Sequence, residues 1–162
     1  MKQEYKFGFE EYDDISDLPP ADASLLEEAR KVTQKAYAPY SNFFVGAAAI
    51  LNNGQKVFGT NQENASYPVG ICAERVLLAS ASMLQTDEPI KTIAISYNNL
   101  SGNGESNRPV SPCGMCRQSL AEYEERVKQP IRLILAGMEG KVMIIESAKQ
   151  LLPFSFGGGD MK

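Results

Sequence analysis

The hydrophobic positions of this chain switch between helical spacing and short continuous runs. Apolar residues recur at helical spacing after Asp22, a helix-capping residue type, and Pro39 ends that pattern. Continuous apolar runs such as 44–51 predict buried strands, and the Asn-Asn-Gly step over 52–54 predicts a hairpin turn. The elements expected in chain order are a helix over 22–36, strands over 44–51 and 56–61, a helix over 73–84, a strand over 90–97, a helix over 113–127, strands over 131–136 and 142–145, and a short helix over 146–151.

This order of elements predicts an α/β fold with a single mixed five-stranded sheet sandwiched by helices. A hairpin followed by strand–helix–strand crossovers produces such a mixed sheet. The 162 residues suit one folded domain, which we expect over 22–156. A charged N-terminal extension over 1–21 precedes it, and a flexible glycine-rich tail over 157–162 follows. The polar segment over 98–110 must be a loop, and it could lie over the mouth of a pocket.

Charge and hydropathy limit the classes of partner. The formal net charge is −4 and no long basic run occurs, so a nucleic-acid partner is not expected. No apolar run approaches the roughly 18 residues of a membrane span, so no membrane partner is expected. The acidic N-terminus lacks the apolar stretch of a signal peptide, which predicts a cytoplasmic protein.

The cysteine and histidine counts narrow the chemistry. Three cysteines, an odd number, without an export signal favour metal binding or catalysis over a disulfide framework. Histidine is absent, which excludes Ser–His, Cys–His and histidine-ligated metal mechanisms. Any zinc site must therefore use thiolates, carboxylates or water.

The three cysteines stand at two expected helix starts, in Cys72-Ala73-Glu74 and in Pro112-Cys113-Gly114-Met115-Cys116. The partial positive charge of a helix N-terminus favours thiolates, and Cys113 and Cys116 lie one helical turn apart. Three such ligands would leave the fourth tetrahedral position of one zinc ion to water, as in catalytic sites. Glu74, two residues from a ligand, is the expected acceptor of that water's proton.

Other interpretations exist for each of these residues taken alone. A lone Cys-x-x-Cys pair is more often structural zinc or redox chemistry, and Glu74 alone would be a solvated carboxylate stabilised by the helix dipole. Arg75 and Arg117 are each adjacent to a ligand, and we expect them to donate hydrogen bonds that offset the negative charge of three thiolates. The alternative is that Arg75 and Arg117 are ordinary surface cations.

Further segments accompany the zinc motifs, namely YAPYSNFFVGAA over 37–48, NQENASYPVGICAER over 61–75, SPCGMCRQ over 111–118 and LLPFSF over 151–156. Together they resemble the cytidine deaminase family, and within it the subgroup with three cysteine zinc ligands. The signature Cys-x-Glu followed by Pro-Cys-x-x-Cys is that of zinc deaminases. The resemblance covers roughly residues 22–156 and implies the fold of that family.

The resemblance also implies roles for residues outside the zinc motifs. Phe43 would stack against a pyrimidine base, and Asn61 and Glu63 would hydrogen-bond the ribose 3′-hydroxyl. The backbone N–H of Ala73 would meet the pyrimidine O2 atom. The competing interpretation of Phe43 is plain packing in the core. Asn61 and Glu63 could instead be loop residues without a function.

Family members of this length are typically homotetramers, so the resemblance implies shared active sites. Tyr67 and Phe156 would reach the site of a neighbouring subunit. Phe156 could instead only anchor the tail.

The motifs and the resemblance predict a zinc-dependent hydrolase of pyrimidine salvage that deaminates the small molecules cytidine, deoxycytidine or both. Zinc-bound hydroxide is expected to attack C4, with release of ammonia. Within the same chemistry, the alternative is a deaminase of a cytosine-nucleoside antibiotic of the blasticidin S type. The alternatives from other classes are a non-catalytic zinc-binding module and a redox protein in which Cys113 and Cys116 form a reversible disulfide.

Overall fold

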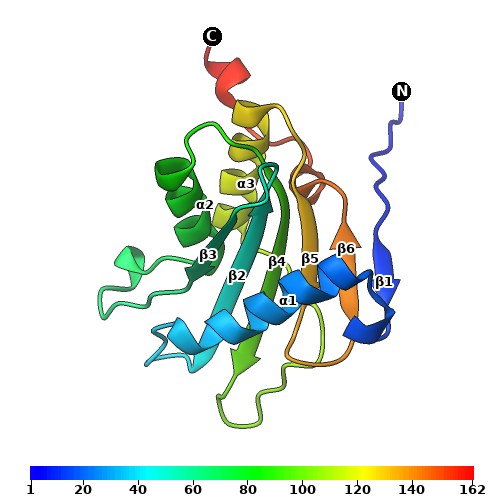
Figure 1. The fold of residues 1–162 in the computed structure, drawn as a ribbon. Helices are drawn as coiled ribbons and strands as arrows, with labels where there is room; N and C mark the ends of the chain where they lie inside the picture. The colour runs from blue at the N-terminus through cyan, green and yellow to red at the C-terminus, as the bar shows by residue number, and fades with distance from the viewer.

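A six-stranded mixed sheet forms the centre of the computed structural model, which describes residues 1–162 (Figure 1). The strand order is β1-β6-β5-β4-β2-β3; β4 and β5 run parallel, and the other neighbouring strands run antiparallel. The expected α/β fold with a single mixed sheet is confirmed. The strands are β1 (Glu10–Tyr12), β2 (Phe43–Leu51), β3 (Lys56–Thr60), β4 (Ile90–Asn99), β5 (Arg132–Ala136) and β6 (Val142–Ile145).

The prediction of five strands is wrong by one, because β1 is added at the edge of the sheet. Its residues pair antiparallel with residues 142–144 of β6. The sequence of β1, Glu-Glu-Tyr, contains no hydrophobic run. The strand therefore forms because β6 offers a free edge, and not because of its own pattern of residues.

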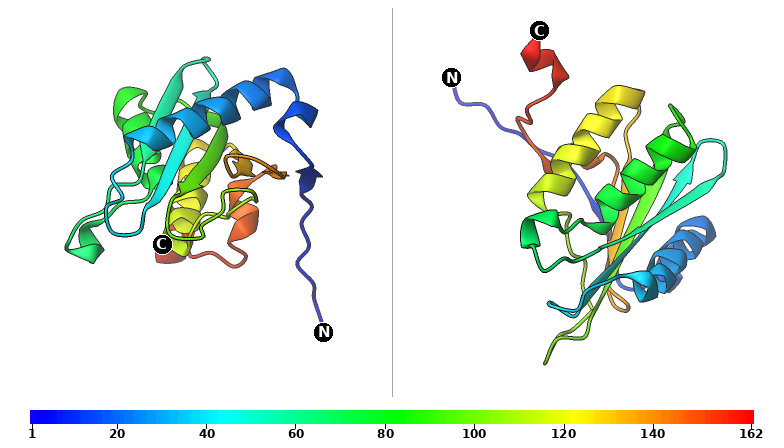
Figure 2. Two further views of the ribbon diagram at one scale, coloured as in Figure 1. Left: turned by 90° about the horizontal axis from the view of Figure 1, so that it is seen from below. Right: turned by 90° about the vertical axis from the view of Figure 1, so that its left-hand side faces the viewer.

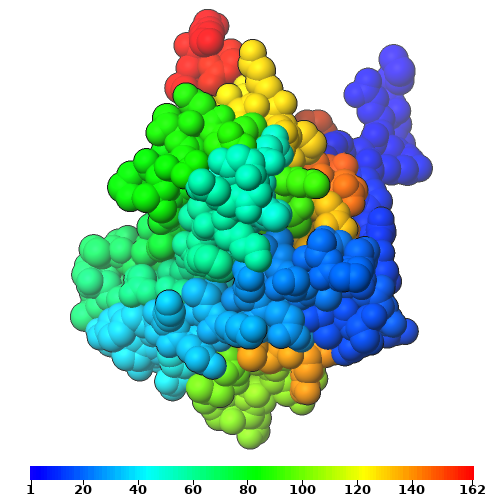
Figure 3. All heavy atoms as spheres, in the orientation of Figure 1, coloured from blue at the N-terminus to red at the C-terminus, as the bar shows by residue number.

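Three α-helices cover the two faces of the sheet: α1 (Pro20–Val32), α2 (Ala73–Leu84) and α3 (Gly114–Val127). Figure 2 shows α1 on one face and α2 with α3 on the other, and Figure 3 shows α1 as a band of atoms across its face. None of these helices is both long and apolar enough to cross a membrane. Shorter 3₁₀-helices are η1 (Ile15–Asp17), η2 (Thr33–Lys35), η3 (Tyr67–Val69), η4 (Ala148–Leu151) and η5 (Gly158–Met161).

Two helix predictions need correction. The first helix begins at Pro20, and Asp22 lies in its first turn instead of capping it. Proline is favoured at this first position because its missing N–H has no partner there in any helix. The last expected helix, over 146–151, is the shorter 3₁₀-helix η4.

Each face of the sheet has its own hydrophobic core. A cluster of 18 buried residues lies between the sheet and the pair α2 and α3, and it includes Leu77, Ile93 and Leu120. A second cluster of 10 buried residues lies beneath α1 and includes Leu26 and Ile134. Because close-packed cores resist displacement, the N-termini of α2 and α3 are held in fixed positions above the sheet.

A glycine in β3 lets α2 lie very close to the sheet. A Cβ atom at Gly59 would lie 2.2 Å from the carbonyl oxygen of Ala73 and 2.6 Å from the backbone nitrogen of Leu77. Any side chain at this position would push away the first turn of α2, where Glu74 lies.

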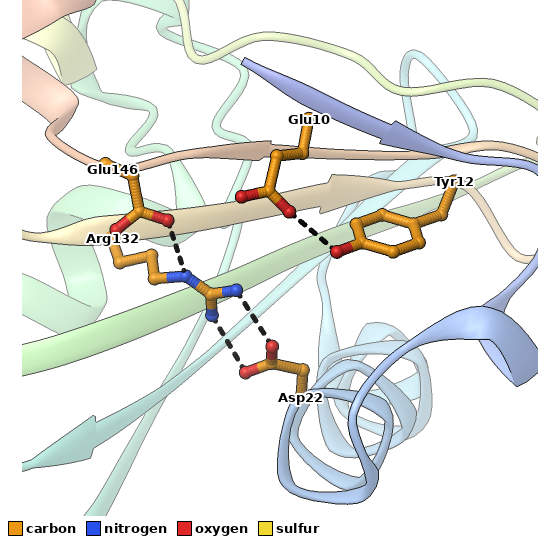
Figure 4. Close-up of polar contacts among 5 residues, drawn as sticks. All are labelled: Glu10, Tyr12, Asp22, Arg132 and Glu146. Carbon is orange, nitrogen blue, oxygen red and sulfur yellow. Dashed lines mark hydrogen bonds and ion pairs between the residues drawn. The ribbon is translucent and has the colours of Figure 1, made fainter. Parts of the chain in front are cut away.

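Arg132 of β5 joins three parts of the molecule on the α1 side (Figure 4). Its Nη1 and Nη2 atoms donate to the two carboxylate oxygens of Asp22 at 2.8 and 2.9 Å, and its Nε atom donates to Glu146 at 3.0 Å. The Arg132 side chain is only 23% exposed, so this bidentate pair is a firmer link than a surface ion pair. Beside it, the Tyr12 hydroxyl donates to Glu10 at 2.6 Å.

Residues 10–18 lie against the rest of the chain. Leu18 is buried in the core beneath α1, and Tyr12 and Ile15 pack against the same core. The division into an extension over 1–21, a domain over 22–156 and a tail over 157–162 stays a prediction.

Candidate active site

The topology of the sheet brings the two cysteine motifs to the same end of the strands. β3 and β4 both run antiparallel to β2, so the carboxyl ends of β3 and β4 lie side by side at one end of the sheet. Because α2 follows β3 and α3 follows β4, the N-termini of both helices lie at this end. β2 begins there as well, which brings Phe43 beside the two helix starts.

Three thiols converge at this point. Cys72 and Cys113 immediately precede α2 and α3, and Cys116 lies in the first turn of α3. The Sγ atoms of Cys72 and Cys113 are 3.8 Å apart, those of Cys113 and Cys116 are 3.5 Å apart, and all three lie within 4.8 Å of one another. A tetrahedral zinc ion with Zn–S bonds of about 2.3 Å needs sulfur separations of about 3.8 Å. The three thiols therefore fit a zinc ion, which soft thiolate ligands favour.

Protonation at the site is shaped by close contacts and by burial. Hydrogen bonding with Cys116 lowers the pKa of the Cys72 thiol, and the same contact together with burial raises the pKa of the Cys116 thiol. Glu74 is 6% exposed, and burial raises the pKa of its carboxyl group. A buried carboxyl group whose pKa is raised is suited to accept a proton and return it.

A cavity of about 430 Å³ opens beside the sulfurs, and most of its lining residues are hydrophobic. Cys72, Glu74 and Cys113 form part of its wall. Phe43 and Tyr97 form another part, and their rings are stacked with centroids 4.9 Å apart and planes 11° apart. An aromatic wall with a few polar groups suits a flat heteroaromatic ring.

Asn61 and Glu63 line the cavity, and their side chains also hold the segment that carries Phe43. Asn61 accepts from the backbone N–H of Val45 at 2.8 Å and donates to the carbonyl oxygen of Phe43 at 2.9 Å. Glu63 accepts from the hydroxyl and the backbone N–H of Ser41. An amide and a carboxylate have more than two bonding positions, so both residues keep capacity for a ligand.

The other expected binding residues occupy different places. Ala73 is buried and lines the cavity at the start of α2. Tyr67 of η3 lines the cavity but is 74% exposed, and its ring lies 5.9 Å from that of Tyr40. Phe156 is 61% exposed and does not line this cavity. Two expected aromatic residues are thus largely exposed on a single chain.

Neither Arg75 nor Arg117 donates a hydrogen bond to a cysteine sulfur. Arg117 instead donates to the carbonyl oxygens of Pro112 at 2.8 Å and Leu151 at 3.0 Å. It therefore fixes the chain immediately before a cysteine, and is not the expected donor to a thiolate. Arg75 acts through space: after the hydrogen bonds among the thiols, its charge is a smaller cause that lowers the pKa of Cys72.

Tyr97 is a cavity residue that was not predicted. It lies two residues after Ile95 on β4 and pairs with Val45 of β2, so all three share one face of the sheet. This alternation of apolar residues along β4 was the available signal, but the register with β2 was needed to place Tyr97 against Phe43.

The expected loop over 98–110 begins two residues later than predicted, because residues 98 and 99 belong to β4, and it borders the site from the β4 side. It folds against the turn after β5, where a Cβ atom at Gly137 would lie 2.0 Å from the carbonyl oxygen of Ser106. A second cavity of about 300 Å³ lies between this loop and the stacked pair Phe43 and Tyr97. The loop therefore adjoins the main cavity, and Val110 at its end lines it.

Residues 19–129 match the family described as the cytidine and deoxycytidylate deaminase zinc-binding region. This range contains both cysteine motifs, β2 to β4 and all three α-helices.

Individual relatives have the same chemistry in their names. The cytidine deaminase of Halalkalibacterium halodurans is 34% identical over 137 residues, which is 85% of this chain and 95% of that protein. The crystal structure of cytidine deaminase from Burkholderia pseudomallei has 41% identity and a TM-score of 0.71, and the match covers 82% of this chain and 97% of that one. The blasticidin-S deaminase of Bacillus cereus is more distant, at 27% identity over 133 residues, or 81% of this chain and 91% of that protein.

Proposed function

This chain belongs to the cytidine and deoxycytidylate deaminase family, and we propose that Glu74 carries the protons of its reaction. It is a zinc-dependent hydrolase that deaminates cytidine or deoxycytidine and releases ammonia. We propose Cys72, Cys113 and Cys116 as the zinc ligands, since their sulfurs lie within 4.8 Å of one another. The observation that carries the role of Glu74 is its buried carboxyl group, which lies in the cavity wall together with the thiols of Cys72 and Cys113.

The proposed chemistry assigns every proton transfer to one side chain. Zinc, when bound, is a Lewis acid that makes a water molecule far more acidic than in bulk solution. Glu74 takes a proton from the attacking water and passes it to N3 of the pyrimidine as the oxygen adds to C4. Glu74 then takes the proton of the new hydroxyl group and delivers it to the amino group. The C4–N bond breaks, ammonia leaves, and a C4 carbonyl remains.

The cavity residues are proposed to hold the nucleoside. Phe43 stacks against the base, and the backbone N–H of Ala73 meets the O2 atom at the positive end of α2. Asn61 and Glu63 bind the ribose 3′-hydroxyl, which can donate to the carboxylate and accept from the amide. Arg117 is proposed to hold the segment before Cys113, and Arg75 to lower the negative charge at the sulfurs.

We propose a homotetramer with shared active sites. The support is the exposure of Tyr67 and Phe156, two aromatic side chains that a single chain leaves 74% and 61% exposed. Exposed aromatic residues of this kind commonly mark protein interfaces. We propose a role in pyrimidine salvage in the cytoplasm, a compartment that keeps the metal-binding thiols reduced.

Absorbance assays test this function. We expect cytidine and deoxycytidine to lose ultraviolet absorbance faster than blasticidin S, with activity lost after zinc chelation and restored by added zinc. Faster turnover of blasticidin S would favour the antibiotic deaminase. Full activity in protein that metal analysis proves zinc-free would contradict the mechanism.

A further inference from the structure

The Glu63 carboxylate is held by donors from one exposed turn. Its Oε2 atom accepts from the backbone N–H groups of Tyr40 at 2.9 Å and Ser41 at 3.3 Å. Its Oε1 atom accepts from the hydroxyl of Ser41. The turn is shaped by Asn42, whose φ of 53° is left-handed and whose N–H donates to Ala38 at 3.0 Å.

The Ser41 hydroxyl has a fixed direction in this arrangement. Its oxygen accepts from the backbone N–H of Phe43 at 3.1 Å, which leaves its only proton for Glu63. One hydroxyl therefore connects the residue expected beneath the base to the residue expected at the sugar.

The two oxygens of Glu63 are held in different ways. Both backbone donors bind the same oxygen, so alone they fix one point and leave the carboxylate free to turn about it. The bond from Ser41 fixes the second oxygen and thereby the plane of the group. It also lowers the pKa of Glu63, which keeps the carboxylate ionised as an acceptor.

We propose that Ser41 is a positioning residue that turns the Glu63 carboxylate toward the ribose 3′-hydroxyl. This inference rests on the proposed function, in which Glu63 binds that hydroxyl. With the plane fixed, the Oε1 atom accepts one bond from Ser41 and has one acceptor position left, which the sugar hydroxyl fills. Ser41 is exposed and contributes little to the core, so its loss affects binding and not folding.

The test compares 2′-deoxycytidine with 2′,3′-dideoxycytidine, which lacks the 3′-hydroxyl, in the zinc-loaded enzyme. The quantity compared is kcat/KM for deoxycytidine divided by kcat/KM for dideoxycytidine. We expect Ser41→Ala to lower this ratio by about 5- to 10-fold, as for the loss of one ordinary hydrogen bond. The change should come from a higher KM for deoxycytidine, with kcat nearly unchanged, because the contact is made in the bound ground state. Ser41→Thr keeps the hydroxyl and should restore the ratio.

Two further variants make the result decisive. Glu63→Gln should lower the ratio at least as much as Ser41→Ala, while Ser24→Ala, at an exposed serine on α1, should leave it unchanged. Thermal unfolding of each variant checks that the fold is intact.

The possible failures can be told apart. If Glu63→Gln lowers the ratio and Ser41→Ala does not, Ser41 has no positioning role but Glu63 keeps its proposed contact. If neither variant changes the ratio, the proposed contact of Glu63 is wrong as well. An equal loss of kcat/KM on both substrates after Ser41→Ala would mean that Ser41 acts only through Phe43, which also overturns the inference.

Discussion

Glu74 is placed where a single carboxyl group can serve a whole reaction. It stands two residues after Cys72, in the first turn of α2, and Gly59 of β3 keeps that turn close to the sheet. Burial raises the pKa of its carboxyl group, so protonation costs less than it would in water. Glu63 is the one other acidic residue that lines this cavity, and its oxygens accept hydrogen bonds from Ser41.

Glu74→Gln should therefore abolish turnover without releasing zinc. The amide has nearly the same size but cannot accept and return a proton, so kcat should fall by about 10²- to 10⁴-fold. Zinc per chain, measured by plasma mass spectrometry, should stay at the wild-type value because Glu74 is not a proposed ligand. Glu27→Gln, at an exposed carboxylate on α1, is the control and should keep full activity. Substantial turnover by Glu74→Gln would exclude the proposed proton carrier.

At the residue scale, the sequence predicts those parts of the site that depend on local spacing. The cysteines and Glu74 could be found because both motifs begin helices, and a helix start fixes where its first side chains point. The bonds of Ser41 and the stacking of Tyr97 could not be found in this way. They depend on how a turn meets a distant loop and on the register of β2 with β4.

At the scale of elements, Glu124 connects α3 to the strands that follow it. It is 6% exposed and accepts from the backbone N–H of Ile131 at 2.8 Å and from the Ser147 hydroxyl at 2.9 Å. It also accepts from the backbone N–H of Lys149 at 3.4 Å. One buried carboxylate thus joins the C-terminal half of α3 to the start of β5 and to η4.

Glu124→Leu should destabilise the fold by about 2–4 kcal/mol, because each buried donor left without an acceptor costs about 1–3 kcal/mol. The midpoint of urea unfolding, measured at one fixed protein concentration, should fall accordingly. Glu125→Leu changes the next residue on the same helix, which is exposed, and should change the free energy of unfolding by less than about 0.5 kcal/mol. Equal midpoints for the two variants would show that the buried contacts of Glu124 contribute nothing.

Most elements could be predicted from the sequence, because their apolar residues follow helical or strand spacing over many positions. β2 is an unbroken run of this kind, and the hairpin after it carries its turn signal at Gly54, whose φ of +83° favours glycine. β1 could not be predicted, since three residues with one aromatic side chain give no period. The start of α1 differs from the prediction because Pro20 occupies the first helical position, which leaves Asp22 inside the first turn, where it pairs with the distant Arg132.

At the scale of the whole molecule, the exposed aromatic residues support the proposed association of this chain with further copies of itself. Phe154 is 97% exposed, and its φ of 57° is an uncommon conformation for a bulky residue. Phe156 follows on the same segment at 61% exposed, and Tyr67 stands 74% exposed at the cavity. Aromatic residues are enriched at protein interfaces, so their exposure here is consistent with the proposed oligomer.

Shared active sites can be tested by mixing two defective chains. Glu74→Gln lacks the proton carrier but has an intact Phe156, while Phe156→Ala has the carrier and lacks the aromatic side chain proposed to act in a neighbouring site. When both are co-expressed in equal amounts, random assembly in a symmetric oligomer should form a complete site in roughly a quarter of the positions. Assayed at substrate concentrations well below KM, where Phe156→Ala sites contribute little, the mixed enzyme should therefore have roughly a quarter of wild-type activity.

The separate variants set the baseline for this experiment. Glu74→Gln alone should be inactive, and Phe156→Ala alone should have a raised KM with unchanged zinc content, because Phe156 does not line the cavity beside the sulfurs of its own chain. Compared per total amount of chain, activity of the mixture above the mean of the two separate variants requires that one chain supplies Glu74 and another supplies Phe156. A mixture that merely equals that mean would indicate that each site is complete within one chain, and the exposure of Phe156 would then need another partner to explain it.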